Sequence, residues 1–190
     1  MLTGRRAGPV LALTLAMLTL GGCRWFVPAG SYQKDGLSFD HLRGWTVKKD
    51  LQQKDVRTVI VEGPYHALFV ISVFGARVDV PLETFAKSMA RVRSETTKKK
   101  LTVAGLNLGA EGDAMPFLPT ERSIAGQNVR GLDQHFIATI LKVPIAHTVE
   151  LFSIERALRT VIVMDQVANR DRLKVEEGFQ KIFDTVAIGP

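Results

Sequence analysis

The spacing of hydrophobic residues changes several times after residue 30. Residues 67–74 form an almost wholly apolar run, which predicts a strand in the centre of a sheet covered on both faces. Residues 56–62 alternate and are rich in β-branched side chains, which also predicts a strand. The other expected strands are two short ones within 32–48 and longer ones at 128–142, 147–156 and 157–166.

Two segments repeat apolar residues with the spacing of an amphipathic helix. The first covers 81–97, where Pro81 suits the first helical position. The second closes the chain at 170–183. After the first helix, residues 101–120 are rich in glycine and weakly periodic, and we interpret them as a long loop with room for a short strand. No fixed-period repeat interrupts the chain, so residues 31–190 are expected to form a single domain.

The first 22 residues differ from the rest of the chain. They contain Arg5 and Arg6, no acidic residue, and an apolar run over 10–20. A short positive region followed by such a run is typical of a secretory signal. A helix of about 11 residues rises only ~16 Å, which is well short of the ~30 Å hydrocarbon core. We therefore expect residues 1–22 to be a signal peptide rather than a transmembrane anchor.

The end of this segment, Leu20-Gly21-Gly22-Cys23, resembles the lipobox of bacterial lipoproteins. The resemblance implies that Leu20, Gly21 and Gly22 form the signal cleavage motif. It also implies that Cys23 is the lipidation site, where two or three acyl chains would anchor the protein stably. Arg24 follows in place of the aspartate that retains some lipoproteins at the inner membrane, which favours the outer membrane, with the domain facing the periplasm. The alternative is an ordinary signal peptide with a cysteine nearby by coincidence.

The mature chain would begin with a short tether over 23–30, which reaches ~25 Å at most when extended.

A second family resemblance covers residues 32–188. Its matches are the stretch 36–47 with the sequence GLSFDHLRGWTV, Glu62-Gly63-Pro64 before the apolar strand, and Ile124-Ala125-Gly126 before a long strand.

These patterns resemble the PsbP-like superfamily, which includes photosystem II extrinsic proteins and bacterial DcrB-type lipoproteins. The chain departs from the family by lacking the usual proline near Leu42 and by its longer glycine-rich middle. The resemblance implies an α+β fold, namely an α/β/α sandwich with a mostly antiparallel central sheet flanked by helices. It implies no shared activity, because one fold hosts many functions.

Composition restricts the chemistry. The chain of 190 residues has a single cysteine, so it has neither an intramolecular disulfide nor a multi-thiolate metal site. None of the four histidines has another histidine three or four residues away. The sequence also lacks a Gly-x-Ser-x-Gly elbow and a P-loop. We therefore expect no enzymatic activity, no metal and no cofactor.

Basic residues cluster on the outer face and at the exit of the first helix. The cluster consists of Arg91, Arg93, Lys98, Lys99 and Lys100, within a chain of net charge +6. Export makes nucleic acid an implausible partner, so anionic lipid headgroups or an acidic envelope protein are the expected targets. The alternative is a solvated helix face.

Two functions remain open from the sequence. The first is a membrane-anchored envelope lipoprotein that is a non-enzymatic binding or assembly module, presenting a sheet edge or the loop 101–120 to a partner. The alternative is a lipid or small-molecule carrier with a pocket between the sheet and a helix. That pocket would be lined by Phe69, Ile71, Phe85 and Met89.

Overall fold

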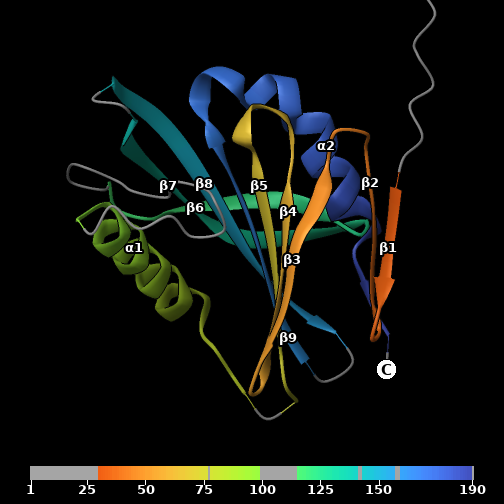
Figure 1. Ribbon diagram of the computed structural model, residues 1–190. Helices are drawn as coiled ribbons and strands as arrows, with labels where there is room; N and C mark the ends of the chain where they lie inside the picture. Colours follow the sequence, from red (N-terminus) through yellow and green to blue (C-terminus); the bar gives the residue numbers. More distant parts are fainter. Residues whose placement is uncertain (1–29, 77, 99–114, 141–142, 157–158, 190) are drawn as a thin grey trace, which may run out of the picture.

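A seven-stranded antiparallel sheet forms the centre of the molecule (Figure 1). The computed structural model describes residues 30–76, 78–98, 115–140, 143–156 and 159–189. Every neighbouring pair of strands in the sheet is antiparallel. In spatial order the strands are β3 (Thr46–Gln53), β4 (Val56–Glu62), β5 (Leu68–Phe74), β9 (Arg159–Ala168), β8 (Val143–Arg156), β7 (Gln127–Ile140) and β6 (Leu118–Ile124).

The two helices lie on opposite sides of this sheet (Figure 1). They are α1 (Leu82–Lys98) and α2 (Arg172–Thr185). The predicted α+β class with a mostly antiparallel sheet between helices is therefore confirmed. Within the described residues, no helix combines the length and the apolar character needed to span a membrane.

A small second sheet lies beside α2 and was not distinguished in the sequence. Its three strands are β1 (Gly30–Lys34), β2 (Leu37–His41) and β10 (Ala187–Ile188), in the order β1-β2-β10. Two short 3-10 turns, η1 (Pro64–His66) and η2 (Asn169–Asp171), complete the described elements. β1 begins at Gly30, the last residue of the expected tether.

The face of the large sheet toward α2 carries the larger core. Alternation along β4 buries Val59 and Val61 on this face, and Val61 lies beside Phe69 of β5. The Phe69 ring meets Phe183 of α2 at a centroid distance of 4.8 Å and Phe179 at 6.2 Å. All five side chains are fully buried, so α2 closes its side of the sheet.

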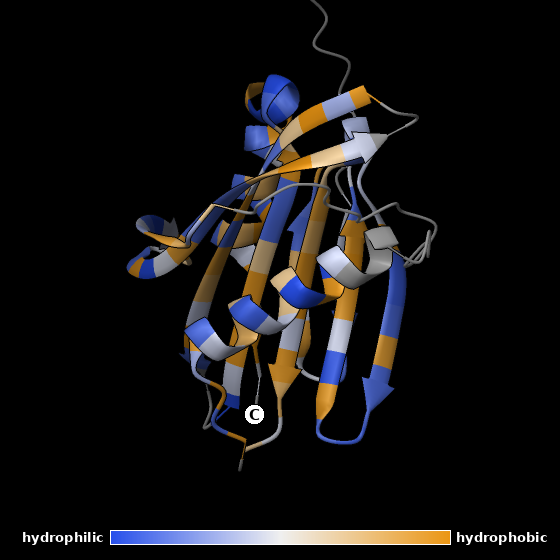
Figure 2. Cartoon of the chain, turned by 90° about the vertical axis from the view of Figure 1, so that its left-hand side faces the viewer, coloured by the Kyte–Doolittle hydropathy of each residue, from blue (hydrophilic) through white to orange (hydrophobic). Residues whose placement is uncertain are grey.

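The opposite face is only partly covered. α1 packs mainly against β7 and β8, where Ala86 belongs to a second core cluster with Phe136, Leu151 and Met164. Figure 2 shows α1 crossing in front of the strands, with hydrophobic strand segments visible beside it. The half of this face formed by β3, β4 and β5 is therefore left without a covering helix among the described elements.

β6 was predicted only in part. It begins at Leu118, near the end of the segment 101–120 that we interpreted as a long loop with room for a short strand, whereas residues 101–114 lie outside the described residues. β6 is an edge strand with a single buried side chain, Ile124, so its sequence carries little hydrophobic alternation. Its pairing with β7 is a tertiary feature that the local pattern does not reveal.

Candidate functional site

The structure describes only part of the residues that the sequence singled out. Outside the described residues lie the cleavage motif and lipidation site, Leu20, Gly21, Gly22 and Cys23, and two of the lysines, Lys99 and Lys100. The predictions attached to them stay predictions. Of the basic cluster, Arg91 lies exposed on α1, and Lys98 is the last residue of that helix.

The prediction that Arg93 belongs to a basic cluster on the outer face of the helix is wrong, because its side chain is only 2% exposed. It follows Ala86 by two helical turns and faces the sheet with it. Its guanidinium donates a hydrogen bond to Gln134 Oε1 and lies 5.0 Å from the centre of the Phe136 ring. Burial lowers the pKa of Arg93 to about 10, so it keeps its charge at neutral pH. Arg93 therefore fastens α1 to β7 and is not part of an anion-binding surface.

An apolar cavity of about 1000 Å³ lies between α1 and the uncovered half of the sheet among the described residues, and we call it the α1 groove. Its apolar lining comes from the four strands β3, β4, β5 and β9, from α1 and from the segment before it. The lining residues are Leu51, Val56, Thr58, Ile60, Leu68, Val70, Ser72, Phe74, Val78, Phe85, Met89 and Met164, with Gln53, Lys54 and Asp55 at the polar end.

The alternation of β4 and β5 builds the sheet wall of the α1 groove. Thr58 pairs with Ser72 and Ile60 pairs with Val70, so these side chains project on the α1 side. On the opposite wall, the Phe85 ring of α1 meets a β5 ring edge-to-face at 6.0 Å. The β4 side chains stay half-buried because no described helix covers them.

The predicted pocket is present, but half of its predicted lining is wrong. Phe85 and Met89 line the α1 groove as expected. Phe69 and Ile71 do not, because they point to the opposite face and belong to the core under α2. Leu68, Val70 and Ser72, their neighbours along β5, line the α1 groove instead.

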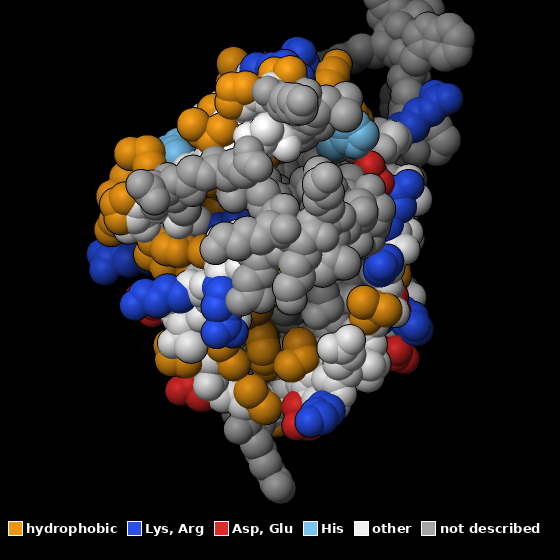
Figure 3. Space-filling model, turned by 60° about the vertical axis from the view of Figure 1, so that its left-hand side comes forward, with side chains coloured by type: hydrophobic (Ala, Val, Ile, Leu, Met, Phe, Trp, Pro, Cys, Tyr) orange, Lys and Arg blue, Asp and Glu red, His pale blue; other side chains and the backbone are white. Residues whose placement is uncertain are grey.

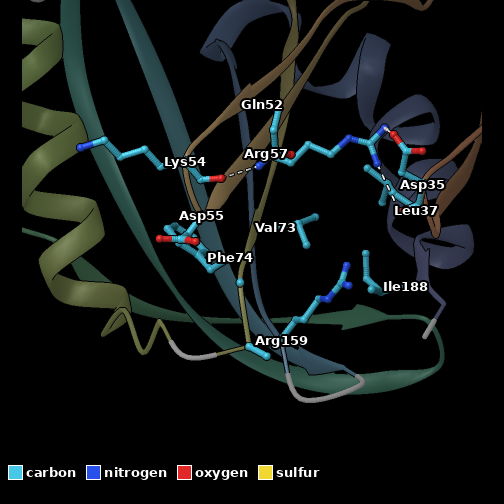
Figure 4. Close-up of a pocket in the computed structure, with 12 residues that line it drawn as sticks. Asp35, Leu37, Gln52, Lys54, Asp55, Arg57, Val73, Phe74, Arg159 and Ile188 are labelled. Carbon is cyan, nitrogen blue, oxygen red and sulfur yellow. Dashed lines mark hydrogen bonds and ion pairs between the residues drawn. The ribbon is translucent and has the colours of Figure 1, made fainter.

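The β3–β4 turn supplies the polar end of the α1 groove. Gln53, Lys54 and Asp55 lie there, and Lys54 takes a positive φ of 50° that the tight turn requires. Figure 4 shows the Lys54 side chain extending toward α1. The α1 groove thus combines a long apolar interior with a cation, a carboxylate and an amide at one end.

A second cavity of about 390 Å³ lies between the two sheets (Figure 4). Its main cation, Arg57, is already engaged by the protein. Arg57 donates to both carboxylate oxygens of Asp50 at 3.0 and 3.1 Å, to the Tyr32 hydroxyl at 2.7 Å and to the Lys34 carbonyl at 2.7 Å. The hydrogen bonds that Asp50 accepts from Arg57 first, and then from Lys34 and Tyr32, hold the pKa of Asp50 well below its usual range. The arrangement joins the two sheets and occupies the Arg57 charge within the protein.

A buried charge cluster holds α2 against the sheet. Arg172 of α2 pairs with Asp165 of β9 through two contacts, at 2.6 and 3.1 Å, and donates to Glu150 of β8 at 2.8 Å. Arg122 of β6 donates to Glu150 at 2.7 Å and to Glu176 at 2.6 Å. Burial raises the pKa of Asp165 to about 7, although the attraction of Arg172 opposes that rise. The charges satisfy one another, as expected of a structural cluster.

One polar series has the residue types of a catalytic triad. Asp133 lies 3.3 Å from His135 Nε2, and His135 Nδ1 lies 2.9 Å from the Thr148 hydroxyl. Thr148 is part of a paired strand rather than a sharp turn that would expose its oxygen, and it also bonds Asn169 at 2.8 Å. These contacts tie β7, β8 and η2 together. In the described part of the chain, no group of three or more His, Cys, Asp or Glu could hold a metal ion.

No family model matches the sequence, and no curated protein matches it. Among solved structures, the chain is similar to cyanobacterial PsbP (CyanoP) from Synechocystis sp. PCC 6803, with 13% identity and a TM-score of 0.47 over 89% of this chain and 98% of that one. It is also similar to PA94 from Pseudomonas aeruginosa, a protein of unknown function and putative regulator, with 18% identity and a TM-score of 0.41 over 85% and 98%.

A third similar structure is LpqN, involved in cell envelope biogenesis of Mycobacterium tuberculosis. Its identity is 7% and its TM-score 0.37, over 87% of this chain and 92% of that one. All three TM-scores lie below 0.5, so these similarities carry neither family membership nor function. The α+β architecture rests on the strand order and helix placement of the chain itself.

Proposed function

We propose that this chain is a bacterial envelope lipoprotein, anchored through an acylated Cys23, whose domain binds an amphiphile with one apolar tail. The observation that carries the proposal is the α1 groove, a cavity of about 1000 Å³ with an apolar interior and one polar end. Small-molecule sites usually have about 300–1,000 Å³ and combine an apolar lining with a few polar groups. The α1 groove is at the large end of that range.

The chemistry of the α1 groove favours a ligand with an elongated apolar part. Its sheet wall exposes half-buried aliphatic side chains to water, and burying such surface is favourable by about 25 cal/mol per Å². The polar end offers the Lys54 ammonium and the Gln53 amide. We therefore expect the ligand to place an acyl-like tail under α1 and an anionic or hydrogen-bonding head near the β3–β4 turn.

An assembly module that adds a partner strand to a sheet edge fits less well. The edge strand β3 carries Lys48 and Lys49 exposed, and the other edge strand, β6, carries Pro119 and Glu121 exposed. Charged side chains and proline on an edge discourage pairing with a further strand. The α1 groove therefore favours the carrier hypothesis over strand addition.

The anchor is tested separately from the α1 groove. Wild-type protein should incorporate radiolabelled palmitate and fractionate with membranes, and density separation should place it in the outer membrane. Cys23→Ser removes the acceptor thiol, so we expect it to lose the label and to appear in the soluble periplasm. Unchanged membrane retention of Cys23→Ser would contradict the lipidation prediction.

The α1 groove is tested by titrating the purified protein with a fluorescent fatty acid bearing a dodecyl chain. Thr58→Trp places an indole in the α1 groove, whereas Thr58→Val keeps its volume and serves as the control. The indole takes up the space of at least two methylene groups of the ligand, and burying each of them would contribute about 0.8 kcal/mol to binding. Such a loss lowers the affinity by at least about tenfold. Equal binding by the two variants, or none by the wild type, would refute a ligand site in the α1 groove.

A further inference from the structure

The β7–β8 hairpin protrudes beyond the rest of the sheet. The last pair between β8 and β9 is His147 with Ala168, and the last pair between β7 and β6 is Asp133 with Leu118. Beyond those pairs, residues 137–140 of β7 and 143–146 of β8 pair only with each other among the described strands. We call these eight residues the hairpin tip.

None of the eight residues of the hairpin tip is charged, and all but Thr139 are apolar; the turn between the two strands, Leu141-Lys142, lies outside the described residues. Its sequence is IATI on β7 and VPIA on β8. Ile137 is 48% exposed and Val143 is 56% exposed, and they project from opposite faces of the ribbon. Figure 3 shows hydrophobic side chains gathered toward the upper end of the molecule. Large apolar side chains grouped in this way indicate a contact surface.

The hairpin tip points to the end of the domain at which β1 begins. A single row of paired residues crosses the large sheet near this end: Thr46, Glu62, Leu68, Gln166, Val149 and Gln134. Gly30 pairs with His41, which is only five residues before Thr46. Val143 lies six residues beyond Val149, a rise of about 20 Å. Figure 1 shows the hairpin and the start of β1 toward the same, upper end.

We propose that the hairpin tip inserts into the headgroup region of the bilayer that holds the acyl chains of Cys23. The inference rests on the proposed anchoring. Seven residues separate Cys23 from Gly30 and span ~25 Å at most. The bilayer surface therefore lies within that distance of Gly30, which is comparable to the rise of the hairpin tip above the sheet. The tether and the hairpin tip together would set the orientation of the domain.

Other groups at this end suit a lipid surface. Tyr65 of η1 is 53% exposed, and aromatic side chains of this kind favour the headgroup boundary. Lys174 lies 4.6 Å from the centre of the Tyr65 ring. Arg170 of η2 is exposed, as is Arg43 in the turn that leads to β3. Cations near an anionic bilayer add attraction.

A protein partner that adds a strand to the hairpin is the main competing occupant. Pro144 lies on the β8 strand of the hairpin tip and has no backbone N–H to donate, which weakens that edge as a pairing template. The free edges also limit the depth of insertion, since unpaired backbone groups are costly in hydrocarbon. A shallow position at headgroup level satisfies both conditions.

The test uses the acylated full chain in liposomes of phosphatidylethanolamine and phosphatidylglycerol. Acylation blocks Cys23, so Val143→Cys would carry the only reactive thiol for an environment-sensitive fluorophore. Glu155→Cys is the matched control, because it lies exposed on the same strand and the same side but at the opposite end. Ile137→Cys provides a second tip position should Val143→Cys fold poorly.

We expect both tip probes to emit at shorter wavelength, to lose several-fold of their quenching by iodide, and to be quenched by lipids brominated near the headgroup. The Glu155→Cys probe should show none of these changes. Liposome flotation of the same sample reports the anchor. Floating protein with tip probes as accessible as the control would overturn the hairpin inference alone. Protein that does not float would refute the anchoring, and this inference with it.

Discussion

Replacing Gly178 with alanine tests a tight contact of the core. The Trp45 indole lies between Gly178 of α2 and Gly63 before η1. A Cβ at Gly178 would lie 2.3 Å from Trp45 Nε1, and one at Gly63 would lie 2.7 Å from Trp45 Cε2. The Phe179 ring meets the indole edge-on at 5.0 Å and restricts it further. The indole is therefore confined by Gly178, Gly63 and Phe179.

Two opposing effects decide the outcome of Gly178→Ala. Alanine raises helix propensity and would stabilise α2 by about 1 kcal/mol. Restoring ordinary contact requires the indole to move by about 1 Å, and overpacking of this kind costs about 1–3 kcal/mol. Because Gly63 also packs closely against the Trp45 indole, we expect the cost of overpacking to prevail and the free energy of unfolding to fall by about 1–2 kcal/mol.

The assay is urea unfolding followed by circular dichroism, with the midpoint as readout. Trp45→Leu provides the control background, because the smaller side chain leaves room for the new methyl group. In that background Gly178→Ala should be neutral or stabilising. A higher midpoint in the wild-type background, or an equal loss in both backgrounds, would refute the packing argument.

Three further outcomes follow from the buried charges. Arg172→Met leaves Asp165 buried without its partner and should lower the free energy of unfolding by about 3–5 kcal/mol. The loss should be larger at pH 8 than at pH 6, because the raised pKa of Asp165 lets this carboxyl become neutral at the lower pH. The pKa of Asp50 is lowered in the folded state, so its contribution is full above pH about 4 and declines below it. Asp50→Asn should therefore lose less stability than the wild type between pH 5 and pH 3, as measured by urea midpoints. Arg93→Met keeps an apolar stem of similar length but loses the hydrogen bond and the ring contact, so thermal unfolding should show a loss of about 1–2 kcal/mol; an unchanged Tm would contradict the assigned role.

Local pattern was sufficient where one face of an element is buried. The alternation of 56–62 and the helical spacing of 81–97 predicted β4 and α1 to within a residue or two. The extent of the polar edge strand β6 was not predicted, because almost none of its side chains is buried. Its existence depends on pairing with β7, and a local sequence pattern does not reveal which strands pair.

The candidate site shows the same division. A pocket between the sheet and α1 was predicted together with Phe85 and Met89, because an amphipathic helix must turn its apolar side toward the sheet. Phe69 and Ile71 were assigned to the wrong face, since β5 is apolar at every position and its pattern does not distinguish the two sides. Arg93 was assigned to the surface by its charge, although it lies in register with the buried side of α1.

The sequence by itself determined the strands with a clear period, both helices, the α+β class and the prediction of an acylated N-terminus. Each of these depends on neighbours in the chain, either through hydrophobic spacing or through a contiguous motif. Only the tertiary structure decided that α1 covers the β7–β8 half of its face and that, among the described elements, no helix covers the half that lines the α1 groove. It also decided that the β7–β8 hairpin extends past its neighbours. Both depend on where distant elements stop covering one another, and no local period carries that information.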